Sequence, residues 1–199
     1  KASKYLLKEA TGAWAVKGSP ADSVKLALSS LLPEKPDLVI SGINAGPNIG
    51  VSILYSGTVG AAAEAAVQGI PAIAVSLGFG HTGNFDCAAR YTARVFDTIG
   101  IERFPERCVV NINVPAIPDE DIQGIRLTRH SQASFNEFYK KVYDPWGREY
   151  FWIDGKLKYP KTADVDAYAL EQGFVSVCPL QFDWTAEAHL TDFRKYFKE

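Results

Sequence analysis

Methionine is absent from the 199-residue chain, position 1 included. We therefore expect a segment that precedes Lys1 in the natural translation product. Cysteine is scarce, and the three that occur are Cys87, Cys108 and Cys178. A domain stabilised by disulfides would carry more of them in an even number, so we interpret these as reduced packing residues. With no signal peptide, the composition favours a cytoplasmic protein.

Two further absences narrow the class of protein. No apolar run is long enough to cross a bilayer, so we expect no membrane association. The formal net charge of -2 provides no positive surface for a nucleic-acid polymer. The remaining composition, 47% hydrophobic and 22% charged residues, is that of an ordinary globular domain.

Residues 36–77 form the stretch around which the rest of the chain is organised. The apolar run at 38–40 predicts a strand buried on both faces, and the glycine- and proline-rich residues 42–50 then break regular structure. Thr58 is placed to cap an alanine-rich helix, and a buried strand follows at 70–77. This order puts the polar loop at the carboxyl ends of parallel strands, where open α/β sheets bind ligands.

The rest of the chain predicts a Rossmann-like, three-layer α/β fold with appendages. Ser19 and Pro20 begin a first helix, as its cap and its first residue. Further helices are expected at 85–99, 164–171 and 185–197, and further strands at 108–114, 124–129 and 174–177. We accordingly divide the chain into an α/β core at 1–130, a protruding β-hairpin at 131–162, and a return strand with a C-terminal helix at 163–199.

The hairpin segment alternates aromatic and charged residues around a turn at Asp144-Pro145-Trp146-Gly147. Its aromatic residues are Phe135, Phe138, Tyr139, Tyr143, Trp146, Tyr150, Phe151 and Trp152. An exposed hairpin with so many aromatic side chains would favour aggregation, and such patches usually mark interfaces. We therefore expect the hairpin to pack on another copy of the chain, in a homodimer or a homotetramer.

Asn44 is the first candidate for chemistry. It follows the strand at 38–40 and lies between Gly42 and Gly46, where the backbone can approach a ligand closely. An amide oxygen is suited to a hard divalent cation, and Asn48 adds a second amide nearby. The alternative is an ordinary loop asparagine that bonds its own backbone.

The second candidate is the helix start at Tyr55-Ser56-Gly57-Thr58. The free N–H groups of a first helical turn attract anions. The hydroxyls of Ser56 and Thr58, with Gly57 between them, suit phosphate oxygens. The alternative is a plain helix cap. A cation ligand and an anion site in consecutive loops at one sheet edge predict a phosphate bridged by a metal ion.

Residues Gly78 to Gly83 offer a different interpretation, because they match G-x-G-x-x-G between a strand and a helix. That context suits an NAD-dependent dehydrogenase. However, the helix begins only after the third glycine, and the next strand ends in Asn113-Val114-Pro115, without an acidic residue for a ribose. Among the histidines, which lie far apart, His130 is the least ordinary because it follows Arg126 and Arg129 at a strand end.

The two central motifs, Ser41-Gly42-Ile43-Asn44-Ala45-Gly46-Pro47-Asn48 and Tyr55-Ser56-Gly57-Thr58-Val59, closely resemble the SurE family of survival-protein phosphatases. Later landmarks that look similar are Gly18-Ser19-Pro20-Ala21-Asp22, Asn111-Ile112-Asn113-Val114-Pro115, Asp164-Val165-Asp166 and Gly173-Phe174-Val175-Ser176-Val177. The resemblance extends over essentially the whole chain. It implies a 5'/3'-nucleotidase that acts on nucleoside monophosphates and needs a divalent metal such as Mg, Mn or Co, with the hairpin and an exchanged C-terminal helix serving oligomerisation.

The resemblance also implies roles for single residues. Asn44 matches the asparagine that binds the metal in the family. The residues expected to hold the substrate phosphate are Ser56, Gly57 and Thr58, with Asn48 and Gly46. The family's aspartate pair, in an N-terminal Asn-Asp-Asp-Gly motif, and its serine ligand have no match here, so the catalytic residues stay unidentified.

A single amide cannot hold a catalytic metal, because hard cations need charged oxygens. We therefore expect the N-terminal β-α-β portion to be absent from these residues, which alone would be inactive and poorly folded. The alternative outside enzymes is an inactive oligomerisation platform.

Overall fold

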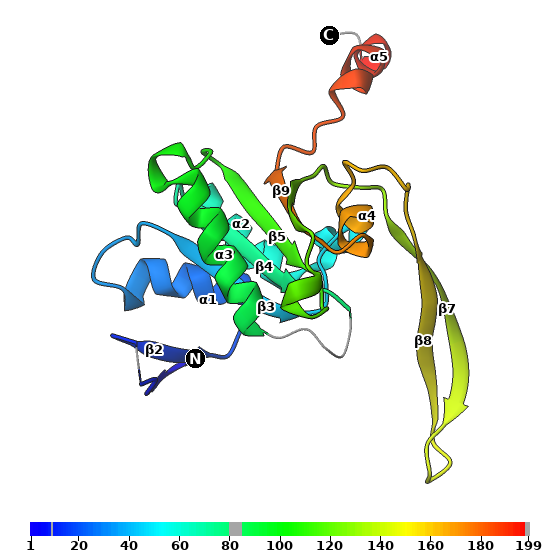
Figure 1. The fold of residues 1–199 in the computed structure, drawn as a ribbon, viewed down its shortest axis with the longest axis horizontal. Coiled ribbons are helices and arrows are strands. Elements are labelled where there is room, and N and C mark those ends of the chain that lie inside the picture. The colour runs from blue at the N-terminus through cyan, green and yellow to red at the C-terminus, as the bar shows by residue number, and fades with distance from the viewer. Residues whose placement is uncertain (9, 80–84, 198–199) are drawn as a thin grey trace.

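A central five-stranded sheet organises the computed structural model, which describes residues 1–8, 10–79 and 85–197 (Figure 1). The strand order is β3-β4-β5-β9-β6, in which β3, β4 and β5 are parallel, β9 is antiparallel to β5, and β6 is parallel to β9. The strands are β3 Val39–Ala45, β4 Ala72–Leu77, β5 Cys108–Val114, β6 Gly124–Leu127 and β9 Phe174–Gln181.

Helices cover both faces of this sheet, which confirms the predicted α/β fold. The α-helices are α1 Pro20–Leu26, α2 Gly57–Val67, α3 Phe85–Ile99, α4 Asp166–Glu171 and α5 Glu187–Phe197. Helix α1 continues as a π-helical turn at Ala27–Leu31, and short 3-10 helices lie at Gly50–Tyr55, Ile101–Arg103 and Asp119–Asp121. None of the helices in the described part of the chain is long and apolar enough to cross a membrane.

The start of α1 confirms the predicted cap. The hydroxyl of Ser19 accepts the N–H of Asp22 at 3.1 Å, and the Asp22 carboxylate accepts the N–H of Ser19 at 2.9 Å. This reciprocal pair satisfies two N–H groups that the first helical turn leaves without partners. The N–H and the hydroxyl of Ser19 both donate to the Asp22 carboxylate, at 2.9 and 2.8 Å, and these two hydrogen bonds lower the pKa of Asp22.

The alternation of β4 decides how the two helix layers pack. All six residues of β4 are buried, and successive side chains point to opposite faces. Ala72 and Ala74 face α2, where they meet the alanines of that helix. Ile73 and Val75 face α3 and fill a thicker core. The side chains are small both on α2 and on the sheet face that α2 covers, so this helix packs closely against the sheet. Its first turn is thereby held near the carboxyl end of β3.

Several boundaries differ from the prediction. The expected loop at 42–50 is too long, because β3 continues through Asn44 to Ala45 and the chain then turns into the 3-10 helix Gly50–Tyr55. At other ends, β6 stops at Leu127, β9 continues to Gln181, α4 begins at Asp166 and α5 begins at Glu187.

The appendages are two antiparallel hairpins and α5. The short strands β1 Ala2–Tyr5 and β2 Ala13–Val16 pair with each other near the N-terminus. The strands β7 Ser134–Tyr143 and β8 Glu149–Lys158 form the long hairpin, which protrudes from the core, and α5 projects from another side (Figure 1). The Asp144 carboxylate accepts the N–H groups of Trp146 and Arg148, each at 2.9 Å, which confirms the predicted turn.

Candidate functional site

The predicted site residues lie on one continuous segment, from the end of β3 to the first turn of α2. Asn44 is the second-last residue of β3, and Gly46 and Asn48 follow in the connecting loop. The 3-10 helix Gly50–Tyr55 then leads into α2. The segment therefore leaves the carboxyl edge of the sheet and returns to it as a helix start, as the sequence predicts.

An irregularity in β3 sets the position of Asn44. The pairing with β4 shifts between Ser41 and Asn44, so that Asn44, one position later than regular pairing would give, lies beside Ser76. Such a bulge reverses which residues face each side of the sheet. Gly42 allows it, because its φ is +139° and a Cβ there would lie 2.5 Å from the carbonyl oxygen of Val75.

Asn44 is half-buried, and its side-chain nitrogen donates a hydrogen bond to the carbonyl oxygen of Gly46 at 2.8 Å. The bond to its own loop, which the sequence left as the alternative, is therefore present. It does not compete with ligand binding, because it uses the nitrogen and fixes the amide orientation. The amide oxygen is the atom left to bind a cation.

The α2 start is capped by Ser56 instead of Thr58, which corrects the prediction. The Ser56 hydroxyl accepts the N–H of Val59 at 3.1 Å, and the helical ladder begins when Gly60 donates to the Ser56 carbonyl at 2.9 Å. A cap at this position leaves the first-turn N–H groups, those of Gly57 and Thr58, pointing out of the helix end. These are the groups that make a helix start an anion site.

Asn48 is buried, with 7% of its surface exposed, and its contacts lie inside the protein. Its side-chain nitrogen donates to the Ser76 hydroxyl at 2.7 Å. Its backbone N–H donates to Asn113 Oδ1 at 2.8 Å, and its carbonyl accepts from Asn111 and Asn113 at 2.9 and 3.1 Å. Substrate contact by Asn48 stays a prediction, whereas these bonds give it a clear part in fixing the loop.

Sequence reasoning missed the support that β5 gives to this loop. Asn111 and Asn113 are fully buried in a strand whose other residues are apolar apart from Cys108. The signal was present in the sequence, because two asparagines two positions apart on a buried strand must face the same side of the sheet. Buried amides need partners, and the Asn48 backbone supplies them to both side-chain nitrogens and to Asn113 Oδ1, whereas Asn111 Oδ1 has no hydrogen-bond partner among the described residues.

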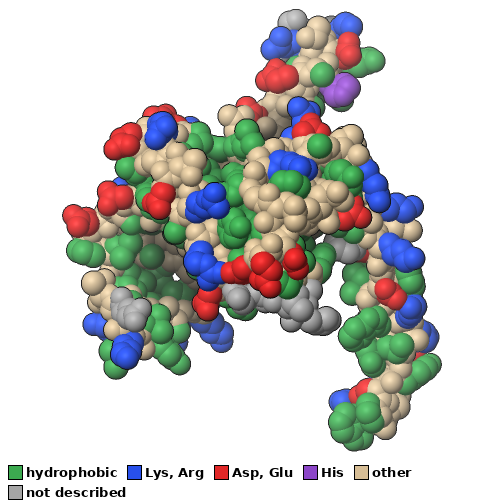
Figure 2. Space-filling model, viewed as in Figure 1, with side chains coloured by type: hydrophobic (Ala, Val, Ile, Leu, Met, Phe, Trp, Pro, Cys, Tyr) green, Lys and Arg blue, Asp and Glu red, His purple; other side chains and the backbone are tan. Residues whose placement is uncertain are grey.

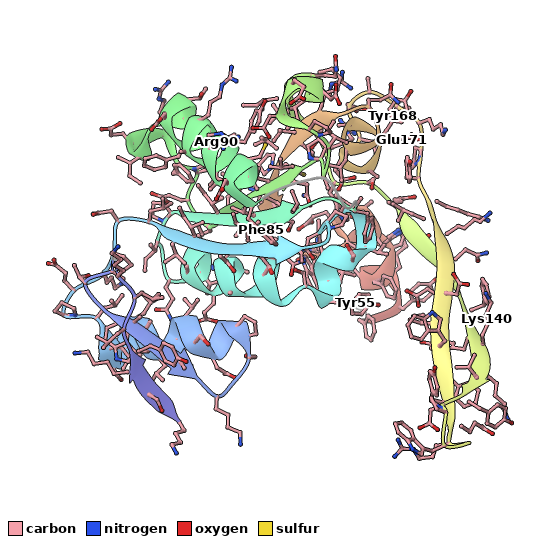
Figure 3. The ribbon with its side chains drawn as sticks, turned by 60° about the horizontal axis from the view of Figure 1, so that its bottom comes forward. Tyr55, Phe85, Arg90, Lys140, Tyr168 and Glu171 are labelled. Carbon is pink, nitrogen blue, oxygen red and sulfur yellow. The ribbon has the colours of Figure 1, made fainter. Side chains whose placement is uncertain are left out.

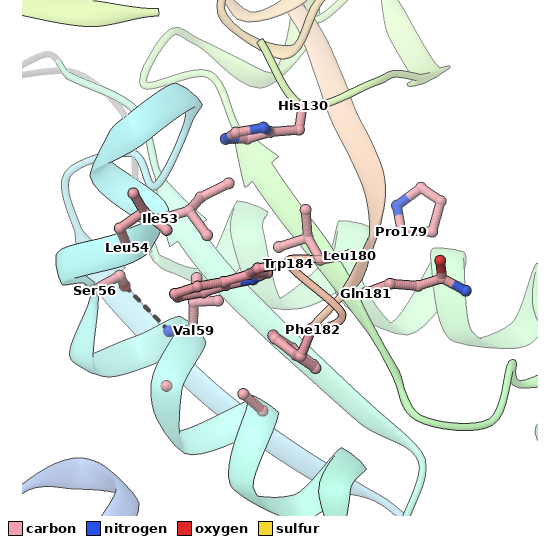
Figure 4. Close-up of a pocket in the computed structure, with 12 residues that line it drawn as sticks. Ile53, Leu54, Ser56, Val59, His130, Pro179, Leu180, Gln181, Phe182 and Trp184 are labelled. Atoms are coloured by element: carbon pink, nitrogen blue, oxygen red, sulfur yellow. Dashed lines mark hydrogen bonds between the residues drawn. The ribbon is translucent and has the colours of Figure 1, made fainter. Parts of the chain in front are cut away.

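An apolar groove of about 660 Å³ opens beside the α2 start (Figure 4). The α2 cap Ser56 and the α2 residue Val59 line one side of it, and His130, Phe182 and Trp184 line it from other parts of the chain. Figure 4 shows the Trp184 ring close to the Ser56 cap. The groove therefore provides apolar and aromatic surface next to the candidate anion site.

Charged groups are scarce in the candidate site. Residues 44–58 include no Asp, Glu, Lys, Arg or His. No cluster of three His, Cys, Asp or Glu side chains that could hold a metal ion occurs among the described residues. Asn44 alone does not fit a divalent cation, because such ions prefer several oxygens and at least one carboxylate. The described residues thus offer one candidate oxygen for a cation, that of Asn44, and do not complete a cation site.

The cysteines behave as the sequence predicts. All three are buried, and none forms a disulfide within the described part of the chain. Burial raises the pKa of Cys178 to about 12 and that of Cys87 to about 11. Both thiols therefore stay protonated at neutral pH, and neither is an activated nucleophile.

The glycine-rich stretch at Gly78 to Gly83 falls mostly outside the described residues, which omit 80–84. Helix α3 begins at Phe85, after the third glycine. Strand β5 ends in Asn113 and Val114 without an acidic side chain. Both features count against a dinucleotide site.

Comparisons with known proteins agree with this geometry. The family model described as Survival protein SurE matches residues 1–137. The protein named 5'-nucleotidase SurE of Thermosynechococcus vestitus is 40% identical over 191 residues, which span 94% of this chain and 72% of that protein. The protein of the same name from Nitratidesulfovibrio vulgaris is 45% identical over 177 residues, 88% of this chain and 71% of that protein.

A solved structure agrees as well. The crystal structure of the SurE protein from Aquifex aeolicus is similar with a TM-score of 0.80 and 33% sequence identity, and the match covers 99% of this chain and 80% of that chain. These matches extend over most of the chain, and they agree with the observed order of loop, helix cap and helix. The chain belongs to the SurE family.

Proposed function

We propose that this protein is a nucleotidase that hydrolyses nucleoside monophosphates, with phosphate at the 5' or the 3' position, to nucleoside and phosphate. The observation that carries the proposal is the α2 start, where the Ser56 cap leaves the N–H groups of Gly57 and Thr58 directed outward. The Thr58 hydroxyl adds a donor at the same helix end. Relatives that are 40% and 45% identical bear the name 5'-nucleotidase, which supports this choice of phosphate ester.

The lack of charge in the site supports a divalent cation as cofactor. A phosphate dianion at the α2 start meets backbone dipoles but no Lys or Arg within residues 44–58. We propose that Mg, Mn or Co compensates this charge and that the Asn44 oxygen is one of its ligands. The described residues hold no group of three or more His, Cys, Asp or Glu side chains that would complete its ligand set.

The neighbouring groove supports an organic phosphate ester as substrate. Its lining is mostly apolar, and it includes the aromatic rings of Phe182 and Trp184 beside Ser56. A phosphate held at the α2 start would leave its nucleoside within reach of these rings. Stacking on aromatic side chains accepts any base, so the groove does not by itself favour one nucleotide.

The hairpin supports self-association. Several large side chains along β7 and β8 are about half exposed or more: Phe138, Tyr139, Tyr143, Tyr150, Phe151, Trp152 and Ile153. Figure 2 shows apolar side chains gathered along the protruding hairpin, and Figure 3 shows its side chains, with Lys140 among them, lying apart from the core. We propose that the hairpin packs on a second copy, as a dimer or tetramer. A monomer in sedimentation velocity at micromolar concentration would contradict this.

Helix α5 supports the same arrangement. It has no buried residue, although Phe193, Tyr196 and Phe197 are large and apolar. A helix with an apolar side normally buries it against another element. We propose that α5 is exchanged between protomers.

Phosphate release by the natural full-length protein tests the nucleotidase proposal. Wild-type protein should release phosphate from AMP, and Thr58→Ala should raise KM more than it lowers kcat, because the variant loses one phosphate donor and keeps the helix N–H groups. NAD binding without phosphate release would favour the dehydrogenase alternative. Neither activity, in a protein that assembles normally, would favour the oligomerisation platform.

A further inference from the structure

A buried carboxylate that the proposed chemistry does not use lies next to the candidate site. Asp166 is the first residue of α4, and none of its surface is exposed. Its Oδ1 accepts the N–H of Ala167 at 2.7 Å, and its Oδ2 accepts the N–H of Gly50 at 3.0 Å. A buried carboxylate is unfavourable unless its oxygens are satisfied, so the contact with Gly50 across 116 positions of sequence is a strong constraint on that residue.

Gly50 is held from its other side as well. The His130 ring nitrogen Nε2 lies 2.8 Å from the Gly50 carbonyl oxygen, and because a carbonyl only accepts, Nε2 must carry the hydrogen. The next residue, Val51, donates its N–H to the Ala133 carbonyl at 2.9 Å. Both peptide groups around Gly50 are thereby fixed by segments that precede and follow the long hairpin.

Gly50 lies in the middle of the candidate site, so the bonds that fix it can set the geometry of that site. It lies between Asn44, the proposed cation ligand, and the α2 start, and it is the first residue of the 3-10 helix that leads to Ser56. On the Asn44 side the loop is fixed by the bonds of Asn48 to Asn111 and Asn113. A loss of the bond at Gly50 would release the second half of the loop only.

We propose that Asp166 is a positioning residue, assisted by His130, which sets the geometry between Asn44 and the phosphate-binding turn through Gly50. This inference rests on the proposed nucleotidase function. Asp166 is fully buried and acts without touching the substrate. His130 also lines the groove beside Ser56, so amide exchange of the loop, more than kcat, reports its positioning effect. Their effect comes from holding a loop that has little regular structure, and small displacements of groups that bind a reacting phosphate cost much activity.

The test compares Asp166→Asn and His130→Ala with Thr92→Ala in the natural full-length protein. Asn keeps the volume of Asp but has only one acceptor oxygen. The N–H groups of Gly50 and Ala167 each need an acceptor, so one of them loses its partner. Thr92 is a matched control, because it is buried and bonds Ala88 on α3, across the sheet from α2. The measurements are kcat and KM with AMP, the unfolding temperature, and hydrogen exchange of the amides in residues 44–58.

We expect kcat to fall about tenfold or more in Asp166→Asn and about threefold in His130→Ala, with faster amide exchange in residues 50–58. Thr92→Ala should lower the unfolding temperature and leave kcat and loop exchange unchanged. If Asp166→Asn fails to fold, His130→Ala decides, since His130 lies at the surface.

The inference is overturned if the folded variants keep kcat within about twofold of wild type, or if their loop exchange matches that of Thr92→Ala. Failure of the proposed function looks different. Wild-type protein would then release no phosphate from AMP, while the exchange measurement would still report whether Asp166 and His130 fix the loop.

Discussion

The site loop at 44–58 and the hairpin at 134–158 are opposites in structure. The hairpin is regular, with its two strands paired residue by residue, yet it is largely exposed. The loop is irregular, yet residues 47–50 are buried and their polar groups bond to side chains from β4, β5 and α4. A regular backbone is therefore no measure of how firmly a segment is held. The fixed geometry that chemistry needs comes from buried, satisfied polar groups.

Gly50→Ala should show the largest difference between the two regions. Gly50 has a φ of +52°, and a Cβ there would lie 2.4 Å from the Ala133 carbonyl oxygen. We expect the free energy of unfolding, measured by urea denaturation, to fall by about 3 kcal/mol or more. The hairpin control is Gly147→Ala, which has a φ of +78° and no described atom within 4 Å of its Cβ. It should cost about 1 kcal/mol. Equal losses would show that the site loop is held no more firmly than the hairpin.

Asn113→Ala should cause the second largest loss in the free energy of unfolding. It removes two hydrogen bonds to the Asn48 backbone and leaves the buried Asn48 N–H without its acceptor. We expect a loss of about 2–3 kcal/mol in the same urea experiment. Asn136→Ala, on the exposed strand β7, is the matched control and should change little. A small effect at Asn113 would mean that β5 does not hold the loop.

Ser56→Ala should cost less, because it removes one cap. The Ser56 hydroxyl accepts a single N–H, that of Val59. The expected loss is about 1 kcal/mol in thermal or urea unfolding. Thr58→Ala is the control, since the cap is Ser56, and it should affect stability less while weakening phosphate binding. The reverse order would restore Thr58 as the cap that the sequence suggests.

Lys140→Ala should have the smallest effect. The Lys140–Asp154 ion pair bridges β7 and β8 with both side chains about half exposed. Such pairs contribute little, because water and salt screen them. We expect no measurable shift in the unfolding midpoint. Lys25→Ala should shift it more, since Lys25 pairs with Glu64, whose side chain is only 16% exposed. A large loss at Lys140 would show that the hairpin is held more firmly than its exposure indicates.

Much of the fold could be predicted because it follows from local patterns. The buried runs of β4 and β5, the Ser19 cap and the Asp144 turn each depend on a few neighbouring residues. The end of β3 could not be predicted in the same way. The bulge at Gly42 depends on the close approach of β4, which no local pattern reveals.

Only those features of the candidate site that depend on neighbouring residues could be predicted. Asn44 and the helix start at Ser56 lie close in sequence, and motif reasoning found both. Asp166 comes from a position 116 residues beyond its partner Gly50, and the role of Asn48 depends on Asn113, 65 residues away. Residues that act only through long-range contacts need the structure to reveal them.

We propose above that the site works with a divalent cation bound in part by Asn44. This proposal is tested most directly by measuring phosphate release from AMP by the natural full-length protein after EDTA treatment and after a divalent cation is restored. We predict no release without the cation, recovery with it, a loss in kcat of about 100-fold in Asn44→Ala, and full activity in Asn136→Ala. Phosphate release that resists the chelator, or full activity in Asn44→Ala, would show that the site does not depend on a cation bound by Asn44.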